Sequence, residues 1–180
     1  AILATPTRKV EEYAKECGFD SPMALFASFL PNTYEVDSNV TPRELLDCLR
    51  RESMNYWQRE EVRSRLDALV ANTPIEGWYD VMVLASIVHE ETKAEDEMAR
   101  VAGVYINRLN RPMLLQADPT AKYAVGDPTI RRVLDRHKRV DSPYNTYQNA
   151  GLPIGPVCAV PARTMEDCIN YEPSDYFFFF

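Results

Sequence analysis

The sequence predicts an α+β fold, mostly helical with a small sheet. Apolar residues recur at the 3.6-residue spacing of amphipathic helices over most of the 180 residues. Two short stretches, residues 113–116 and the aromatic run 176–180, lack that spacing and are typical of strands. No internal repeat or low-complexity linker interrupts the chain. Helices with few scattered strands indicate the α+β class.

The N-terminal third is expected to be helical. Residues 7–16 form a short helix, and Gly18 is the residue that ends it. Thr41 begins a capping box with proline at the first helical position. The leucine pattern that follows predicts one long helix over residues 41–71, or two helices that meet near Gln58.

Two central helices are predicted, over about residues 78–91 and 96–109. The second contains Gly103, and an interior glycine costs helix stability, so we expect another backbone to approach closely there. Residues 113–116 are predicted to form a short strand that the following Asp-Pro pair ends.

The C-terminal part alternates between helix and irregular chain. A short helix is predicted over residues 130–136, and another over residues 161–170. Residues 141–160 contain three prolines and two glycines, which excludes a continuous helix. The final phenylalanine run is predicted to be a buried strand with nothing after it. Because the chain also begins at Ala1 without a methionine, we expect it to be a piece of a longer protein.

Composition limits the classes of function. A chain of 180 residues with 46% hydrophobic residues suits one domain with a real core. The formal net charge of −7 argues against a nucleic-acid binder, which needs a basic surface. The longest central apolar run, residues 81–88, is shorter than the roughly 18 residues of a membrane helix. The four cysteines show neither metal-ligand nor redox spacing.

The most informative segment is the helix that ends in Glu91. An apolar face with the spacing i, i+3, i+4 and i+7 runs along residues 81–88, and three more residues reach Glu91. Glu90 is turned by about 100° toward solvent. A carboxyl group at the edge of an apolar wall has a raised pKa and can hold a proton near neutral pH, as a general acid must. The same spacing is also typical of a structural ion pair at a helix end.

The neighbouring residues do not predict a metal site. The run from His89 to Lys93 differs from the zinc-binding pattern H-E-x-x-H, because Lys93 stands where the second histidine must be. His137 is the other of the two histidines. We therefore expect neither a metal nor a cofactor.

Ordered motifs lie along the chain in the segments Phe29–Glu35, Ala85–Thr92, Val101–Leu109, Met113–Thr120, Asp141–Tyr147 and Gly151–Pro156. Together they closely resemble the endolytic murein transglycosylases, the YceG-like (MltG-type) family, from about residue 19 to the last residue. The family often has an acidic residue where His89 stands and a basic one at Glu90, so both are expected to be solvated helix positions.

The resemblance implies cleavage of the β-1,4 bond between MurNAc and GlcNAc inside peptidoglycan strands. Glu91 matches the family's catalytic glutamate, which acts first as an acid and then as a base toward the muramyl 6-hydroxyl, leaving 1,6-anhydro-MurNAc ends. An intramolecular hydroxyl has a high effective concentration, so no second carboxylate need activate water. Two alternatives remain open: a hydrolytic muramidase with Asp118 as second carboxylate, and a non-catalytic peptidoglycan-binding module.

Substrate-binding residues are expected in the other motifs. Gln116 and Asp118 suit hydrogen bonds to sugar amides and hydroxyls, and the charge of Asp118 also favours a cationic transition state. Asp118 and Thr120 equally suit the cap of a turn. The loop 144–147 offers aromatic faces and polar groups that suit sugar rings. Alternatively, its side chains only pack against the rest of the protein. Arg108 is expected either to pair with a carboxylate near Glu91 or to stabilise the C-terminal end of its own helix through its positive charge. The candidate substrate-binding residues are Gln116, Asp118, Thr120, Tyr144, Asn145, Thr146, Tyr147 and Asn107.

The resemblance also implies a location and a domain division. The full-length protein is expected at the extracytoplasmic face of the bacterial inner membrane on a single N-terminal anchor, and this piece is expected to be soluble. Its partners are peptidoglycan strands and, as a further expectation, cell-wall synthases. Residues 1–33 are expected to be a helical lead-in and residues 34–180 a C-terminally truncated catalytic domain. The basic cluster in residues 131–139 is expected to be a solvated face, or a contact for acidic stem peptides or lipid headgroups.

Overall fold

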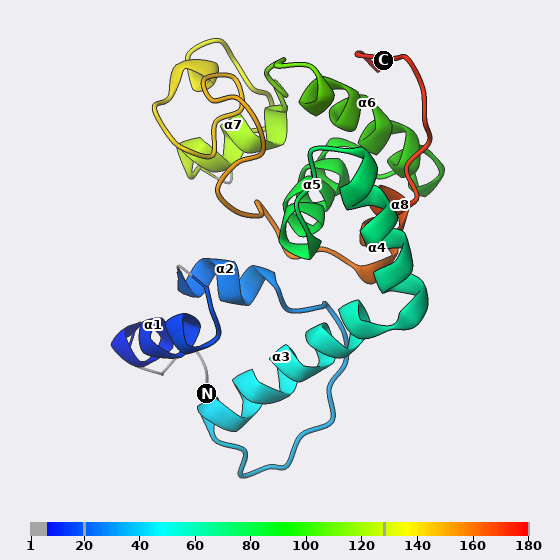
Figure 1. Cartoon of the computed structure of the whole chain (residues 1–180). Helices are drawn as coiled ribbons and strands as arrows, with labels where there is room; N and C mark the ends of the chain where they lie inside the picture. The colour runs from blue at the N-terminus through cyan, green and yellow to red at the C-terminus, as the bar shows by residue number, and fades with distance from the viewer. Residues whose placement is uncertain (1–6, 20, 128, 180) are drawn as a thin grey trace.

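The computed structural model describes residues 7–19, 21–127 and 129–179, and every regular element in them is a helix (Figure 1). Two single turns of 3-10 helix, η2 (Glu95–Glu97) and η3 (His137–Arg139), accompany the α-helices. The α-helices are α1 (Thr7–Glu16), α2 (Pro22–Ala27), α3 (Pro42–Gln58), α4 (Glu60–Asn72), α5 (Trp78–Glu91), α6 (Met98–Asn110), α7 (Asp118–Val125) and α8 (Ala162–Ile169).

The predicted α+β class with a small sheet is wrong, because the described residues contain no strand. Residues 113–117 form no regular element, and the amide of Gln116 donates to the carbonyl of Thr146 (3.1 Å) in a loop. The C-terminal segment 171–179 runs along α6, where side chains of that helix bind its carbonyls. A β-prone segment without a partner strand does not become a strand. Phe180 lies outside the described residues.

Several helix boundaries predicted from capping signals are confirmed. The bounds of α1 are those expected, and Gly18 follows it with a φ of 83°. The capping box before α3 is present: the amide of Thr41 donates to Glu44 Oε2 (2.8 Å), and the amide of Glu44 donates to Thr41 Oγ1 (3.3 Å). The chain bends at Arg59, so the long leucine pattern forms two helices.

Two predictions around the middle loop region are wrong. Asp118 and Pro119 do not end a strand but begin α7, because proline fits the first helical turn, where its missing N–H is not needed. The predicted helix 130–136 is an irregular loop that leads to η3. At its start, Asp127 accepts hydrogen bonds from both the amide (2.8 Å) and the hydroxyl (2.6 Å) of Thr129, a local arrangement that competes with helix.

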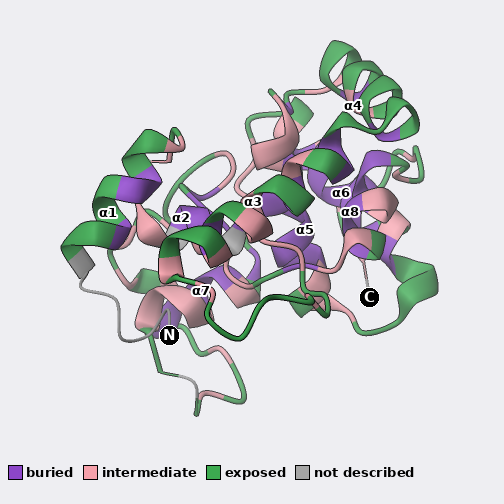
Figure 2. Cartoon of the chain, turned by 90° about the horizontal axis from the view of Figure 1, so that it is seen from below, coloured by how far each residue is buried: buried purple, intermediate pink, exposed green. Residues whose placement is uncertain are grey.

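The main core surrounds α5, which packs against α6, α7 and α8. All residues from Val81 to Val88 are buried, so this helix is covered on every side, as the purple ribbon of α5 in Figure 2 shows. A second, smaller cluster joins α1, α2 and the start of α3 through Tyr13, Leu25 and Leu46. None of the described helices combines the length and apolarity that a membrane span requires.

The expected close approach at Gly103 is confirmed. A Cβ atom at this position would clash with the carbonyl oxygen of Glu172, in the segment that follows α8. The amide of Glu172 donates to the carbonyl of Ala99 (3.0 Å), which holds the segment against α6. The absent side chain thus lets residues 171–179 reach the end of α6 near Glu91.

Candidate active site

Glu91 is the last residue of α5 and lies between the buried core and solvent. The preceding residues are buried, whereas Glu91 is half-buried. The amide of Thr92 donates to the carbonyl of Val88 (3.1 Å), which closes the helix directly after Glu91. On the adjacent helix α6, the hydroxyl of Tyr105 donates to Glu91 Oε2 (3.2 Å). The carboxyl group is therefore fixed by one buried phenol and is accessible on one side.

Burial raises the pKa of Glu91 above its ordinary value, and the nearby carboxylate of Asp118 raises it further. The hydrogen bond from Tyr105 and the positive charge of Arg108 oppose this shift without cancelling it. Burial, together with the charge of Glu91, also raises the pKa of Tyr105, so this phenol keeps its proton and remains a donor. The expected raised pKa of Glu91 thus has a physical basis in the structure.

Asp118 and Tyr147 form a hydrogen-bonded pair near Glu91. Tyr147 donates its hydroxyl proton to Asp118 Oδ1 at 2.6 Å. Burial and the Asp118 carboxylate raise the pKa of Tyr147, and the charge of Glu91 adds to this shift. Asp118 is exposed at the first position of α7, and Tyr147 is half-buried in the following loop. Two predicted site residues from separate motifs thus meet beside the candidate acid.

Thr120 and Thr146 lie beneath this pair and join its two segments. Both are buried, and their hydroxyl oxygens are 2.8 Å apart. The amide of Ala117 donates to Thr146 Oγ1 (3.0 Å), and Thr120 Oγ1 donates to the carbonyl of Ala117 (2.7 Å). These hydroxyls therefore connect the start of α7 to the loop that carries Tyr147.

Asn145 and Asn107 direct their side chains to the chain's own backbone. The Asn145 amide nitrogen donates to the carbonyls of Lys138 (3.1 Å) and Val140 (2.7 Å), and its oxygen accepts from the amide of Tyr147 (3.1 Å). The Asn107 amide nitrogen donates to two carbonyls of the segment 171–179, at 2.7 and 2.9 Å. The structure places both as supports of neighbouring segments.

Gln116 has the one positive φ, 49°, among the described non-glycine residues. Side chains other than glycine rarely adopt this left-handed conformation, and its cost is typically met at functional sites. The hydrogen bond from its own amide to Thr146 holds the strained backbone in place. Its exposed side chain, two residues before Asp118, makes no hydrogen bond with the described residues.

Tyr144 faces another hollow, away from Glu91. Its ring centroid lies 4.7 Å from that of Tyr123. It lines a hollow of about 570 Å³ between the end of α1, the start of α5 and the loop at Ile154. Of the residues expected to converge on Glu91, the structure brings Asp118 and Tyr147 to it, puts Asn145 beneath them and puts Tyr144 elsewhere.

Arg108 forms no ion pair with the described residues, against one of the two expectations for it. It is buried, and its guanidinium donates to the carbonyls of Phe177 (2.7 Å) and Leu115 (2.6 Å). Its charge nevertheless lowers the pKa of Glu91. Arg108 therefore binds two extended segments and also favours the ionised form of the candidate acid.

Two features of the site were missed by sequence reasoning. The sequence analysis did not single out Tyr105, although a phenol on the helix beside Glu91 can donate to its carboxyl group. The C-terminal aromatic run was expected to be a strand. Instead Phe178 and Phe179 line a hollow of about 610 Å³ together with Glu91, and Phe179 packs against Tyr105 with ring centroids 5.6 Å apart.

The residues beside Glu91 have ordinary surface roles. Glu90 is exposed and pairs with Lys93 at 3.1 Å. His89 Nδ1 lies 3.4 Å from Thr164 Oγ1, and burial lowers the pKa of this histidine. Among the residues that the structure describes, no three metal-ligating side chains gather at one place.

The basic cluster 131–139 is only partly a solvated face. Its arginines are exposed, whereas His137 is buried and bonds to the amide of Leu134 (3.1 Å). Lys138 lies 5.1 Å from the centre of the Tyr147 ring. The cluster therefore supports the loop behind Asp118 on one side and meets solvent on the other.

Known proteins resemble large parts of this chain. A protein named endolytic murein transglycosylase from Bacillus subtilis (strain 168) is 37% identical over 101 residues, which are 56% of this chain and 28% of that protein. One of the same name from Streptococcus pneumoniae serotype 2 (strain D39) is 35% identical over 157 residues, 83% of this chain and 26% of that protein. The chain thus spans little more than a quarter of these curated relatives.

Structure and family comparisons agree with these relatives. The crystal structure of a YceG-like protein from Listeria monocytogenes matches with a TM-score of 0.75 and 26% sequence identity, over 97% of this chain and 56% of that one. The model of the YceG-like family matches residues 4–180. The chain described above therefore belongs to the YceG-like family.

Proposed function

We propose that this chain is the catalytic part of an endolytic peptidoglycan transglycosylase, with Glu91 as its catalytic residue. The observation that carries the proposal is the environment of Glu91: a half-buried carboxyl group whose pKa burial raises, open to a hollow on one side. The names of the relatives from Bacillus subtilis and Streptococcus pneumoniae support the same activity.

The proposed reaction uses one carboxyl group twice. Protonated Glu91 donates its proton to the glycosidic oxygen, so the bond from the muramyl C1 breaks and the GlcNAc 4-hydroxyl leaves. Positive charge then builds on C1, where the Asp118 carboxylate favours it electrostatically. The muramyl 6-hydroxyl attacks C1 and gives its proton to the Glu91 carboxylate. The product is a 1,6-anhydro-MurNAc end, and the enzyme is again protonated.

The neighbours of Glu91 suit both stages. Burial keeps the proton on the carboxyl group before bond cleavage. After the proton has left, the hydrogen bond from Tyr105 and the charge of Arg108 stabilise the carboxylate. A single group with these opposing influences can act as acid and then as base.

Supporting roles follow from the contacts. We assign Gln116, Asp118 and Tyr147 to substrate contact, because their side chains lie at the surface beside Glu91 or next to Asp118. We assign the buried groups of the same motifs to positioning, because their polar atoms bond within the chain. These positioning residues are Thr120, Asn145, Thr146 and Asn107.

A hydrolytic muramidase is the second candidate, favoured by the closeness of Asp118 to Glu91. Asp118 would then activate a water molecule that attacks C1, and the product would carry a reducing MurNAc end. The two candidates use the same proton donor and differ in the nucleophile.

Mass spectrometry of the products separates the candidates. The protein is incubated with purified sacculi, and the released fragments are digested and weighed. The transglycosylase gives anhydro ends, one water lighter than the reducing ends of a muramidase. If fragments with neither kind of end are released, both enzymatic candidates are contradicted and a non-catalytic peptidoglycan-binding module is favoured.

For the full-length protein we propose a site at the extracytoplasmic face of the inner membrane, held by an N-terminal anchor and close to cell-wall synthases. An endolytic enzyme that shortens nascent strands needs to reach them where they are made.

A further inference from the structure

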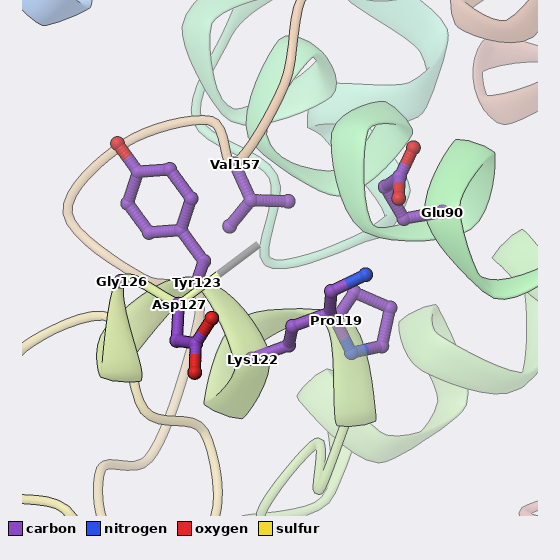
Figure 3. A pocket seen from close by; sticks show the side chains of 7 residues that line it. All are labelled: Glu90, Pro119, Lys122, Tyr123, Gly126, Asp127 and Val157. Atoms are coloured by element: carbon purple, nitrogen blue, oxygen red, sulfur yellow. The ribbon is translucent and has the colours of Figure 1, made fainter. Parts of the chain in front are cut away.

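A second hollow lies beside the candidate active site, and the proposed reaction does not use it. Its volume is about 520 Å³. It is lined by Pro119 and Lys122 of α7, which follow Asp118, and by Glu90 of α5, which precedes Glu91 (Figure 3). The hollow is thus lined by the residue before the candidate acid Glu91 on α5 and by the residue after Asp118 on α7.

One positive charge in this hollow has no partner. Lys122 is only half-exposed, and it forms no hydrogen bond or ion pair with the described residues. Figure 3 shows its side chain extending from α7 toward the side on which Glu90 lies. Glu90 is already paired with Lys93 at 3.1 Å. The ammonium group of Lys122 is therefore available for an anion that enters the hollow.

The rest of the hollow combines apolar walls with one further charge. Tyr123 and Val157 lie on the side away from Glu90 (Figure 3), and Tyr123 is held by its contact with the ring of Tyr144. Asp127, at the far end, uses Oδ1 to accept two hydrogen bonds from Thr129, and its side chain is exposed. An occupant with a carboxylate, small apolar groups and an amine would be complementary to this lining.

The muramyl sugar carries such a group. Its 3-oxygen bears a lactyl unit and a short peptide with alanine methyls, free carboxylates and the amine of a diamino acid. This peptide leaves the ring that contains the reacting C1, so it emerges close to Glu91 when the sugar is bound for cleavage. Neither the hollow lined by Phe178 nor the one lined by Tyr144 has an unpaired lysine at its wall.

We propose that the hollow between Glu90 and α7 binds the peptide of the muramyl residue, with Lys122 binding one of its carboxylates. The proposal rests on the proposed function for the choice of substrate. It adds a determinant of specificity: strands that carry peptides are bound more tightly than bare glycan. A charge-assisted contact of this kind changes affinity by about tenfold.

Binding to soluble fragments tests this independently of catalysis. Calorimetry compares a GlcNAc–MurNAc disaccharide that carries its peptide with the same disaccharide freed of it by an amidase. The wild type is expected to prefer the peptide-bearing fragment by about tenfold. Lys122→Gln should lose this preference, and Lys122→Arg should keep it. Lys15→Gln is the matched control, because it removes an exposed lysine charge on α1 that does not line the hollow.

Several outcomes would overturn the proposal. One is a wild type that binds the two fragments with equal affinity or binds neither of them. The others are an unchanged preference in Lys122→Gln and an equal loss in Lys122→Gln and Lys15→Gln. Equal affinity of all variants for the peptide-free disaccharide shows that they are folded. A wild type that prefers the peptide but cleaves no strand contradicts the proposed function and leaves the peptide site standing.

Discussion

At the scale of single residues, the site depends on how the surroundings of Glu91 balance its two protonation states. Burial and Asp118 favour the neutral acid, while Tyr105 and Arg108 favour the carboxylate. The net effect is a raised pKa, which has consequences for stability and for the pH profile of activity.

Glu91→Gln is expected to stabilise the protein at neutral pH. Because the folded-state pKa of Glu91 lies above its ordinary value of 4.5, its contribution to stability is complete below the unfolded pKa and is lost as pH rises through the folded pKa. Glutamine carries no charge and avoids this loss. Urea unfolding should therefore show a higher free energy of unfolding for the variant at pH 7 and no difference near pH 4. A wild type that is more stable than the variant at pH 7 would contradict the raised pKa.

Tyr105→Phe should move the alkaline limb of the activity profile to higher pH. The change removes the hydrogen bond that lowers the pKa of Glu91 and keeps the buried ring. Activity requires protonated Glu91, so it should persist to higher pH, although the rate at the optimum falls because the carboxylate stage is less stable. Tyr56→Phe is the control, since Tyr56 is equally buried and bonds to Ala162 instead. A reduced rate with an unshifted limb would mean that the Tyr105 hydroxyl does not set the pKa of Glu91.

At the scale of elements, short contacts between helices and loops build the site. The hydroxyls of Thr120 and Thr146 connect α7 to the loop of Tyr147, and Asn107 and Arg108 connect α6 to the segment 171–179. The sequence motifs that carry the family resemblance are thus largely the contacts that hold these segments together.

Gly103→Ala is expected to destabilise the protein by about 1–3 kcal/mol, because the new Cβ meets the Glu172 carbonyl. Displacement of the segment 171–179 should also lower cleavage activity, since Phe179 packs on Tyr105. Gly77→Ala is a matched control: no atom lies within 4 Å of a Cβ at this position. Its free energy of unfolding should change by less than about 0.5 kcal/mol. Equal effects of the two substitutions in urea unfolding would contradict the close packing of this segment on α6.

Local signals predicted most of the helices but not α2 or α7, and they wrongly predicted a small sheet. Capping residues and 3.6-residue spacing located α1, α3, α5 and α8 to within a residue or two, because these signals act within one element. The two predicted strands failed because strand formation depends on a distant partner, and side chains of α6 bind one of these segments instead. The start of α7 was missed because Asp-Pro is compatible with both a turn and a helical first turn.

At the scale of the whole molecule, the described residues form two hydrophobic cores of unequal size. The large one surrounds α5 and carries the site, and the small one joins α1, α2 and the start of α3. The lead-in expected over residues 1–33 overlaps this small core, which also takes Leu46 from α3. The division at residue 33 stays a prediction.

Hydrogen exchange should separate the two cores. Amides of α1 and α2 are expected to exchange faster than those of α5, because a few buried side chains stabilise the small cluster and many stabilise the large one. Mass spectrometry after exchange measures this directly. Equal protection of α2 and α5 would show that the chain opens as a single cooperative unit.

Sequence reasoning predicted that Glu91 lies at the edge of an apolar helix face, because a residue's register on its own helix decides which way its side chain points. It did not identify Tyr105 as the partner or place Tyr144 away from Glu91, because both depend on how separate segments pack. Asp118 and Tyr147 came from recognised motifs, and their direct hydrogen bond is visible only in three dimensions.

The central claim is that Glu91 supplies the proton for strand cleavage. The most direct measurement is the rate at which sacculi release shortened strands, for Glu91→Gln and for Glu61→Gln, an exposed glutamate on α4. Glutamine keeps the shape and cannot donate the proton, so the first variant should fold and lose at least about a hundredfold in rate. The second should cleave like the wild type and give anhydro ends. Full cleavage by Glu91→Gln would contradict the proposed mechanism.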